Sequence, residues 1–448
     1  MASEASVVPV ASYTSYPTVE HFGAFSYGDY LRAVAAVRIR SGLRNRVLHL
    51  QIPSISSGSH SAGPDTKERA RPGIALYLDY LKREIEIQGE LFANMNELDE
   101  LHLCGGIATC CTDRQLSELL AQVRRYFKLV PEQDGEFVLR VDPRTITPAR
   151  LDSMRAQGFN RVIVVAIMDG QTNTLLRTNA LAVTAAMARD AGFRSLSIEL
   201  LFSATQHHAF AVNGALARVI AASPERITIV NAAHSYPLRT ESAQLPARQT
   251  GLNLWRLCVK RLGEAGYLHL GMEQFVRPND ELAVAQQQGR LHRHLQGYSI
   301  HPEADVIACG PGAIGAVGAT YSQNHATQAD YYAPLDINAL PIARGVRLSM
   351  DDALRRRIIA MLMCHFELAI TSLELGYPIT FATYFADEIV RLRGMEAEGL
   401  LTVEAEWLTV TAKGRLKVRD ICQVFDRGLA HAQASVASRV DSACDGVA

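Results

Sequence analysis

The chain has 448 residues, of which 48% are hydrophobic and 20% charged, and its 45 basic side chains nearly balance 46 acidic ones. A net charge this close to zero excludes a strongly basic nucleic-acid-binding protein, although a local basic patch stays open. No apolar run reaches the roughly 18 residues that a membrane span needs, and the first residues lack the basic and apolar segments of a secretory signal. We therefore expect a cytoplasmic protein without nucleic-acid or membrane partners, and the sequence leaves its oligomeric state open.

Short β-branched apolar runs alternate with amphipathic stretches from about residue 47 to residue 276. The strand candidates are Val47–Pro53, Glu100–Cys104, Phe137–Asp142, Arg161–Ile167, Ser195–Phe202, Arg226–Ala233 and Leu268–Val276. A strand–helix unit of about 30 residues is typical of parallel strands joined by right-handed crossovers. The repetition of this unit predicts an α/β fold with a full or partial (β/α) barrel.

The helix candidates between these strands include Ala75–Ala93, Asp113–Phe127 and Leu175–Ala191. One of them has an explicit start signal, because Thr112 followed by Gln115 fits a capping box. A second helix start is indicated by Thr147-Pro148, where a capping residue precedes a proline at the first helical position.

The alternation weakens after residue 276. Leu348–Leu375 and Tyr384–Gly399 have helical patterns, and Leu400–Thr411 has the pattern of a short hairpin before a final helix. We therefore expect a mostly helical, winged C-terminal domain. The predicted division is an N-terminal arm at 1–45, a barrel with an extension at 46–335, the helical domain at 336–432 and a frayed tail at 433–448.

The cysteines are the candidate metal or thiolate ligands. All eight are scattered without a Cys-x-x-Cys pair, which is typical of a reducing compartment rather than of a disulfide framework. Cys104, Cys110 and Cys111 follow or end a predicted strand, so a thiolate or metal site with His49 or His60 is one hypothesis. Because adjacent cysteines rarely chelate one ion, packing of the barrel rim is favoured.

Two further parts of the sequence could form ligand sites, one because it is rich in glycine and the other because it is rich in polar residues. Gly310-Pro311-Gly312-Ala313-Ile314-Gly315 formally matches Gly-x-Gly-x-x-Gly, but the residues after it are poor helix formers, so a loop over a pocket is favoured over a dinucleotide site. The stretches 277–281 and 291–298 are dense in polar groups that could hold a carboxylate-rich substrate. A solvated surface with local ion pairs is the favoured interpretation from spacing alone.

Several motifs nevertheless resemble those of one family. They are Tyr13-Thr14-Ser15-Tyr16-Pro17-Thr18, Val141-Asp142-Pro143-Arg144, Gly271–Gln286 with Gln296-Gly297-Tyr298, and Thr411-Ala412-Lys413-Gly414-Arg415. Through them the chain resembles, over nearly its full length, the oxygen-independent coproporphyrinogen III oxidase (HemN) family of radical S-adenosylmethionine (SAM) enzymes. The resemblance implies a partial (β/α)6 barrel of the radical SAM type with a mostly helical C-terminal domain. It also places Arg277, Asp280 and Tyr16 among the candidate substrate contacts.

The sequence departs from this family at the cluster-binding motif. The resemblance implies three cysteines, Cys-x-x-x-Cys-x-x-Cys, after Ile52-Pro53, and these three positions are Ile55, Ser59 and Ala62. Isoleucine and alanine carry no ligand atom, and one serine cannot hold a [4Fe–4S] cluster that needs thiolates. We therefore expect no cluster, no metal and no radical initiation.

The positions implied for SAM binding are also changed. Where the family has a tyrosine, this chain has His49, and the family's Gly-Gly-Gly-Thr-Pro turn corresponds to a segment that begins at Cys104. Arg140 replaces a glutamate of the family, and Glu199 replaces an aspartate. The candidate cofactor-binding residues are Cys104, Gly105, Gly106, Arg140, Glu199, Ala233 and Ile314. The candidate general bases are Glu199, His49 and His60, and the sequence does not choose between them.

Two hypotheses follow for the function. The first is a non-radical enzyme that binds SAM, or a related small anionic ligand, in the barrel and carries out displacement, elimination or transfer at the sulfonium. The second is a non-catalytic protein that binds a tetrapyrrole or haem. The first is favoured, because replacement of a glutamate by Arg140 and of an aspartate by Glu199 is typical of a retuned site rather than of a decaying one.

Overall fold

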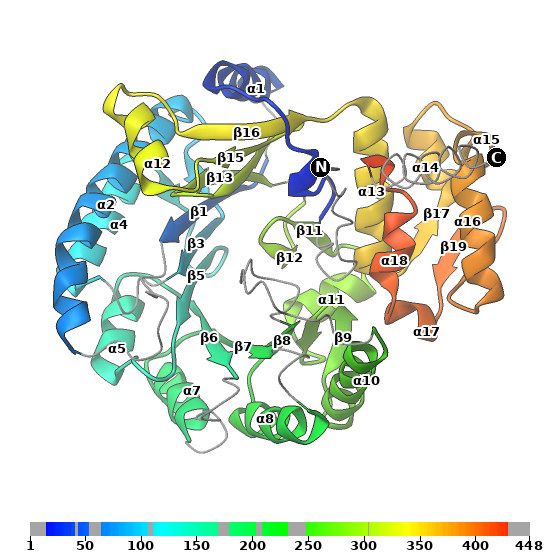
Figure 1. The fold of residues 1–448 in the computed structure, drawn as a ribbon, viewed down its shortest axis with the longest axis horizontal. Helices are drawn as coiled ribbons and strands as arrows, with labels where there is room; N and C mark the ends of the chain where they lie inside the picture. The colour runs from blue at the N-terminus through cyan, green and yellow to red at the C-terminus, as the bar shows by residue number, and fades with distance from the viewer. Residues whose placement is uncertain are drawn as a thin grey trace, which may run out of the picture.

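A curved sheet of twelve strands forms the larger part of the molecule (Figure 1). The computed structural model describes residues 15–40, 44–52, 64–105, 111–168, 179–202, 208–231, 248–302 and 304–428. Across the sheet the strand order is β16-β15-β14-β13-β1-β3-β5-β6-β7-β8-β10-β9. None of the helices in these ranges is long and apolar enough to span a membrane.

Six consecutive strands at the centre of the sheet are parallel. They are β1 (Arg46–Ile52), β3 (Glu100–Gly105), β5 (Glu136–Val141), β6 (Arg161–Ile167), β7 (Ser195–Phe202) and β8 (Arg226–Asn231). The helices α2 (Pro64–Leu91), α4 (Asp113–Tyr126), α5 (Pro148–Ala156), α7 (Ala180–Asp190), α8 (Ala209–Ala222) and α10 (Arg248–Glu264) cover its convex face (Figure 1). This arrangement confirms the predicted partial (β/α)6 barrel.

Antiparallel strands extend both edges of the parallel core. On one side β13 (Asp305–Cys309) runs parallel to β1 and is followed by antiparallel β14 (Ile314–Val317), β15 (Thr320–Asn324) and β16 (Ile342–Arg347). On the other side lie β10 (Gln274–Val276) and β9 (Leu268–Gly271). The prediction of one strand over Leu268–Val276 is therefore wrong. The chain turns at Met272, whose φ is +49°, and forms a hairpin.

The barrel stays open, and a small hairpin lies between its two edges (Figure 1). This hairpin consists of β11 (His292–His294) and β12 (Gly297–Ser299), which pair antiparallel. The remaining elements outside the C-terminal domain are the 3-10 helix η2 (Val19–His21), the helices α1 (Tyr27–Arg40), α11 (Glu281–Gln287) and α12 (Gln328–Asp336), and the short parallel pair β2 (Glu97–Leu98) and β4 (Lys128–Leu129).

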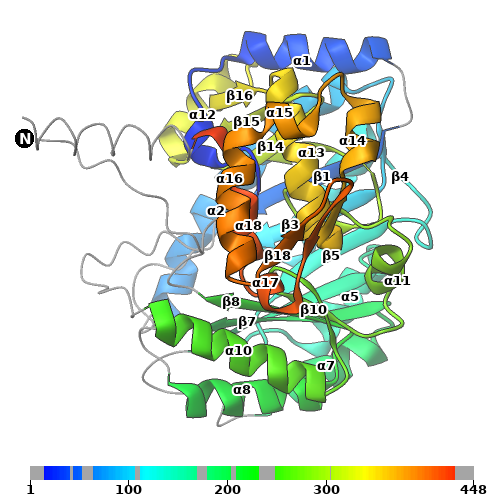
Figure 2. The ribbon, with the colours of Figure 1, turned by 90° about the vertical axis from the view of Figure 1, so that its right-hand side faces the viewer.

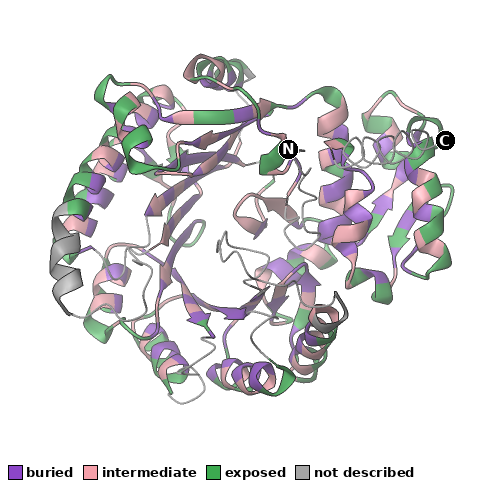
Figure 3. Ribbon diagram, viewed as in Figure 1, coloured by how far each residue is buried: buried purple, intermediate pink, exposed green. Residues whose placement is uncertain are grey.

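The alternation of side chains along each parallel strand decides what faces the interior of the barrel. On β1, the residues Leu48, Leu50 and Ile52 are fully buried in the core between sheet and helices. His49 and Gln51 lie between them and therefore point to the opposite, inner face. Buried residues line the strands throughout this part of the molecule (Figure 3). The apolar side chains of each strand thus pack against the outer helices, and the polar side chains that alternate with them line the interior of the barrel.

The C-terminal domain (Figure 2) packs around a second hydrophobic cluster, which it shares with Tyr16 and with residues of β9, β10, α11 and β12. Its elements are α13 (Met350–His365), β17 (Glu367–Ala369), α14 (Ile370–Gly376), α15 (Phe381–Tyr384), α16 (Ala386–Ala397), β18 (Leu401–Val403), β19 (Trp407–Val410), α17 (Ala412–Arg415) and α18 (Val418–Gln423). The mostly helical domain is as predicted. The continuous helix expected over Leu348–Leu375 is wrong, because the chain leaves α13 at Phe366, whose φ is +61°. It then forms β17, which completes a three-stranded sheet in the order β17-β19-β18.

Candidate active site at the mouth of the barrel

Four predicted site residues lie on the inner face near the C-terminal ends of four strands. They are His49 on β1, Cys104 on β3, Arg140 on β5 and Glu199 on β7. Between β1 and β3 the register pairs His49 with His102 and Gln51 with Cys104. The pairing of Leu103 with Leu139 then places Cys104 beside Arg140. In parallel α/β barrels this end of the sheet carries the functional groups.

Arg140 and Glu199 form an ion pair inside the barrel. The register pairs Arg140 with Ile163 of β6, and Val165 of β6 with Glu199, so the guanidinium group crosses one whole strand to reach the carboxylate. Glu199 is only 7% exposed, whereas about a third of the Arg140 side chain is exposed (32%). The pair therefore joins a buried carboxylate to a cation that still contacts the space above the sheet.

Cys104 and His49 form a second pair of opposite charges. Burial alone would raise the pKa of the Cys104 thiol, but the neighbouring imidazole of His49, together with the charges of Arg140 and His102, lowers that pKa from 9.0 to about 6. Burial opposes the charged form of His49 too, yet Cys104 raises the pKa of the imidazole overall. This environment therefore shifts both groups towards their charged forms, the thiolate and the imidazolium.

His49 is also held by polar groups from two elements. Its Nε2 lies 3.2 Å from Oε1 of Gln51 on the same strand. A hydrogen bond with Gln296, in the turn between β11 and β12, further raises its pKa. Its Nδ1 is buried without a hydrogen-bond partner among the described residues. The hairpin that closes the open side of the barrel therefore also orients the imidazole.

A buried carboxylate lies below this group, at the start of β3. Glu100 is 2% exposed and accepts hydrogen bonds from Nε2 of His102 at 2.8 Å and from Oγ of Ser299 at 2.9 Å, with Nε2 of His294 at 3.6 Å. Burial would raise its pKa, but the hydrogen bond with His102 and the nearby imidazole of His294 hold that pKa well below its usual range. This cluster fixes the β11–β12 hairpin to β3 and thereby supports Gln296.

Two glycines allow close main-chain contacts at the mouth. At Gly105, where φ is +93°, a Cβ atom would lie 1.7 Å from the carbonyl oxygen of Ile52. At Gly310, where φ is +112°, it would lie 2.2 Å from the carbonyl oxygen of Gln51. Gly310 begins the glycine-rich segment, which connects antiparallel strands β13 and β14. No helix opens there, so the segment is not a dinucleotide-binding turn, as the sequence indicated.

The structure places the remaining predicted site residues elsewhere. Ile314 begins β14 and packs against Phe22, Tyr321 and Leu348. The Tyr16 hydroxyl donates to Oδ1 of Asp352 at 2.9 Å, and its ring packs in the cluster of the C-terminal domain. Their assignment as ligand or substrate contacts stays a prediction.

Arg277 and Asp280 lie at the opposite end of the barrel from Cys104. Oδ2 of Asp280 accepts from Nε of Arg226, the first residue of β8, at 2.9 Å, and Oδ1 caps α11. Arg277 donates to Oγ of Ser223 at 2.7 Å and lies 4.2 Å from the ring centroid of Tyr267. Local ion pairing and capping, the favoured interpretation from spacing, account for these contacts.

Several predicted positions fall outside the described residues. They are Ile55, Ser59, His60, Ala62, Gly106, Cys110 and Ala233. The identity of the donor atoms can still be tested from the sequence, because the segment from Pro53 to Gly63 contains no cysteine. Among the described residues no group of three or more His, Cys, Asp and Glu side chains could hold a metal ion. This donor set does not fit a [4Fe–4S] cluster, which requires thiolate ligands.

The curved parallel sheet with an outer layer of helices and a mostly helical C-terminal domain define an α/β-barrel protein of the radical SAM fold. The structure matches that of "Coproporphyrinogen III oxidase (HemN) from Escherichia coli", described as a radical SAM enzyme, with a TM-score of 0.82 at 32% identity over 93% of this chain and 97% of that one. Residues 348–416 match the family described as the HemN C-terminal domain.

Curated relatives agree with this structural match. The oxygen-independent coproporphyrinogen III oxidase of Pseudomonas aeruginosa is 34% identical over 435 residues, which cover 93% of both chains. The Escherichia coli protein of the same name is 33% identical over 426 residues, which cover 92% of both chains. The chain therefore belongs to the oxygen-independent coproporphyrinogen III oxidase family.

Sequence reasoning missed the residues that surround the predicted ones. Glu100, His102 and Gln296 were not singled out as site residues, although the stretch 291–298 was noted for its polar groups. The sequence does contain a signal for Glu100 and His102. Residues 100, 102 and 104 alternate along one strand, so their side chains lie on the same face as that of Cys104. The contact of Gln296 with His49 has no such local signal, because these residues are 247 positions apart in the chain.

Proposed function

We propose that this family member works without a [4Fe–4S] cluster and binds SAM, or a related small ligand with an anionic group, at the mouth of the barrel for polar chemistry at the sulfonium. The observation that carries the proposal is the combination of Cys104, His49, Arg140 and Glu199 on four strands around one point. Three of these four positions, 49, 104 and 140, differ in residue class from the family pattern, and the fourth keeps a carboxylate.

The charges of this group favour a ligand that carries both signs. Two of the four members are positive, His49 and Arg140, and two are negative, Cys104 and Glu199. Arg140 would bind a carboxylate, because a guanidinium group offers several donors in a planar fork. Glu199 would bind an ammonium group, and Gly105 lets a ligand approach the main chain. A tetrapyrrole with several carboxylates matches this balanced charge less well.

Bound SAM would supply a sulfonium, whose neighbouring carbons are electrophilic. The protein supplies orientation and charge: Arg140 and Glu199 hold the amino-acid part, and the rest of the group presents a polar surface. Of the three candidate bases, His49 is shifted towards its protonated form, Glu199 is engaged by Arg140, and His60 lies outside the described residues. Displacement or transfer therefore fits these residues better than a base-dependent elimination.

Isothermal calorimetry tests the binding step. We expect SAM to bind the purified protein, and Arg140→Gln and Glu199→Gln to weaken binding by about 10-fold or more, as for the loss of one charged hydrogen bond. Arg344→Gln, in the antiparallel extension, is the matched control. No binding at millimolar SAM would refute the proposal, and binding of coproporphyrin or haem instead would establish the tetrapyrrole-binding alternative.

The activity named for the relatives provides the opposing hypothesis. A coproporphyrinogen III oxidase that uses radical chemistry needs its cluster, so anaerobic reconstitution with iron and sulfide followed by metal analysis discriminates directly. We expect no stoichiometric iron or sulfide. Four irons per chain together with SAM cleavage would show that other cysteines replace the missing ligands, and would refute a cluster-free mechanism.

A further inference from the structure

We propose that Cys104 is the nucleophile of this site, that His49 holds its proton in the free protein, and that the thiolate accepts an alkyl group from a sulfonium ligand. This inference rests on the proposed function for the identity of the ligand. It goes further in naming the attacking atom, the residue that activates it and the bond that forms.

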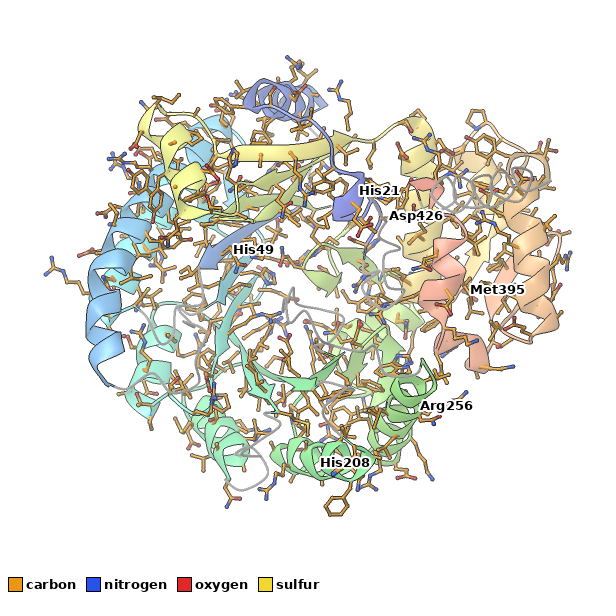
Figure 4. The ribbon with its side chains drawn as sticks, in the orientation of Figure 1. His21, His49, His208, Arg256, Met395 and Asp426 are labelled. Atoms are coloured by element: carbon orange, nitrogen blue, oxygen red, sulfur yellow. The ribbon has the colours of Figure 1, made fainter. Side chains whose placement is uncertain are left out.

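The placement of His49 makes the pair more than an isolated cysteine. Residues 49 and 104 are diagonal neighbours on adjacent parallel strands, because His49 pairs with His102, two residues before Cys104 on the same face. Figure 4 shows His49 on the inner side of β1. Its buried Nδ1 lacks a hydrogen-bond partner among the described residues, although the ring is otherwise fixed by Gln51 and Gln296. An activated nucleophile has this arrangement, with a neighbouring imidazole that is oriented by a third group.

Positive groups face Cys104 from three strands. They are His49 from β1, His102 from its own strand β3 and Arg140 from β5. Glu199 reaches Arg140 from β7 and partly offsets that charge. Together they bring the pKa of the thiol to about 6 against the effect of burial. Cys104 is also partly exposed, and reactive cysteines are typically found in such electropositive, accessible environments.

The other described cysteines show that this environment is not general. Cys258, Cys309, Cys364 and Cys422 are all buried, and burial raises the pKa of each thiol, to about 12 for Cys258 and Cys364. These four thiols behave as small apolar core residues. Compared with these four thiols, that of Cys104 is shifted in the opposite direction, towards the thiolate.

The chemical step balances without an oxidant or a second reactant. The Cys104 thiolate uses a lone pair to form a bond to a carbon attached to the sulfonium. The bond between that carbon and the sulfonium breaks, and its electron pair stays on the departing sulfur, which becomes a neutral thioether. His49 keeps its proton throughout, and the products are an S-alkylated Cys104 and the thioether.

The ionisation of Cys104 can be measured without any ligand. The rate of alkylation by iodoacetamide is followed against pH and assigned to Cys104 by peptide mass spectrometry, which separates it from the other cysteines. We expect a midpoint near 6 in the wild type and a midpoint above about 8 in His49→Gln, close to that of an ordinary thiol. His208→Asn, which keeps a capping residue at an exposed helix start, is the control and should leave the midpoint unchanged.

The midpoint is a better readout than the rate at neutral pH. A pKa of 6 gives about 90% thiolate at pH 7 and an ordinary pKa of about 8.5 gives about 3%. The more basic thiolate is, however, roughly 10-fold more nucleophilic, which offsets most of this roughly 30-fold difference in thiolate fraction and leaves a difference of only about 3-fold in the rate. A wild-type midpoint near 8.5, or the same midpoint in His49→Gln, would overturn the inference.

The acceptor step is tested with SAM carrying a labelled methyl group. We expect one methyl group on the Cys104 peptide, lost in Cys104→Ser, whose fold and SAM binding are checked by circular dichroism and calorimetry. Bound SAM without a label on Cys104 would overturn the inference and leave the proposed function standing. Absence of SAM binding would overturn both.

Discussion

The buried carboxylate of Glu84 supports the barrel mouth from outside the sheet, and replacing it with glutamine tests this support. Glu84 on α2 is 0% exposed. It accepts hydrogen bonds from the main-chain N–H of Gly310 at 2.7 Å, from Nδ2 of Asn324 at 2.7 Å and from the hydroxyl of Tyr331 at 2.5 Å. Even with these donors, burial raises its pKa from 4.5 to about 7. Each pKa unit corresponds to about 1.4 kcal/mol.

The sign of the effect follows from the raised pKa. Stability contributed by the protonated form of Glu84 is complete below pH 4.5 and is lost as the pH rises to about 7, because the unfolded chain releases the proton first. The loss amounts to about 3 kcal/mol. In Glu84→Gln the side chain stays neutral, so the variant escapes this loss, although its amide group disrupts one of the hydrogen bonds at a cost of about 1–2 kcal/mol.

The assay is urea-induced unfolding of wild type and Glu84→Gln in parallel across this pH range. We expect the difference in unfolding free energy to change by about 3 kcal/mol in favour of the variant as the pH rises. The contributions of all other titrating groups to the unfolding free energy are the same in both proteins and cancel when the two are subtracted. Leu76→Gln, at an exposed position of the same helix, changes no titrating group and should give a difference that does not vary with pH. If the difference in unfolding free energy between wild type and Glu84→Gln also does not vary with pH, the reasoning is refuted. Burial would then not outweigh the three hydrogen-bond donors in setting the pKa of Glu84.

Three further predictions concern the frame of the site. Gly105→Ala should cost more than about 2 kcal/mol in thermal unfolding, because the new Cβ would lie 1.7 Å from a main-chain oxygen at a φ of +93°; a cost below 1 kcal/mol would contradict this. Asp280→Ala should cost about 1.5–3 kcal/mol in urea unfolding, because buried Arg226 loses one of two carboxylate partners and keeps only Glu281, and adding Arg226→Met should recover part of this cost but not the lost N-cap of α11. His21→Gln should lower stability only at acid pH. Because Asp426 raises the pKa of His21 above 6.5, this ion pair stabilises fully below pH 6.5 and less as the pH rises through the raised value, so an equal loss at pH 9 would count against it.

The sequence predicted the strands and helix starts well where local signals are strong. The bounds of β6 and β7 are those expected, and Thr112 with Gln115 forms the predicted capping box. The hairpin at Met272 and the end of α13 at Phe366 were missed. Both turns depend on non-glycine residues in the left-handed region, which propensity gives no reason to expect.

The members of the site were predictable one at a time, but their pairing was not. Arg140 and Glu199 lie on strands that are separated by β6, so their contact depends on sheet register and on side-chain length. The ionisation of Cys104 depends on burial and on three neighbours from different strands. Asp280 shows the reverse case. The family resemblance makes it a candidate substrate contact, whereas its position near the first residue of β8 places it at the end of the barrel away from the mouth.

The changes at the mouth are consistent with one another, which argues for a retuned site. A guanidinium at position 140 would lack its ion-pair partner if Glu199 had been lost, and a thiolate at position 104 would be costly without cations beside it. In the structure each new charge has a partner: Arg140 with Glu199, and Cys104 with His49. Random loss of a cofactor site would leave small or apolar replacements, as at the cluster-binding positions Ile55 and Ala62. The changed positions 49, 104 and 140 at the mouth instead carry polar groups that have partners. A site in which Cys104 and His49 arise together, each stabilising the charged form of the other, is instead the arrangement that nucleophilic chemistry requires.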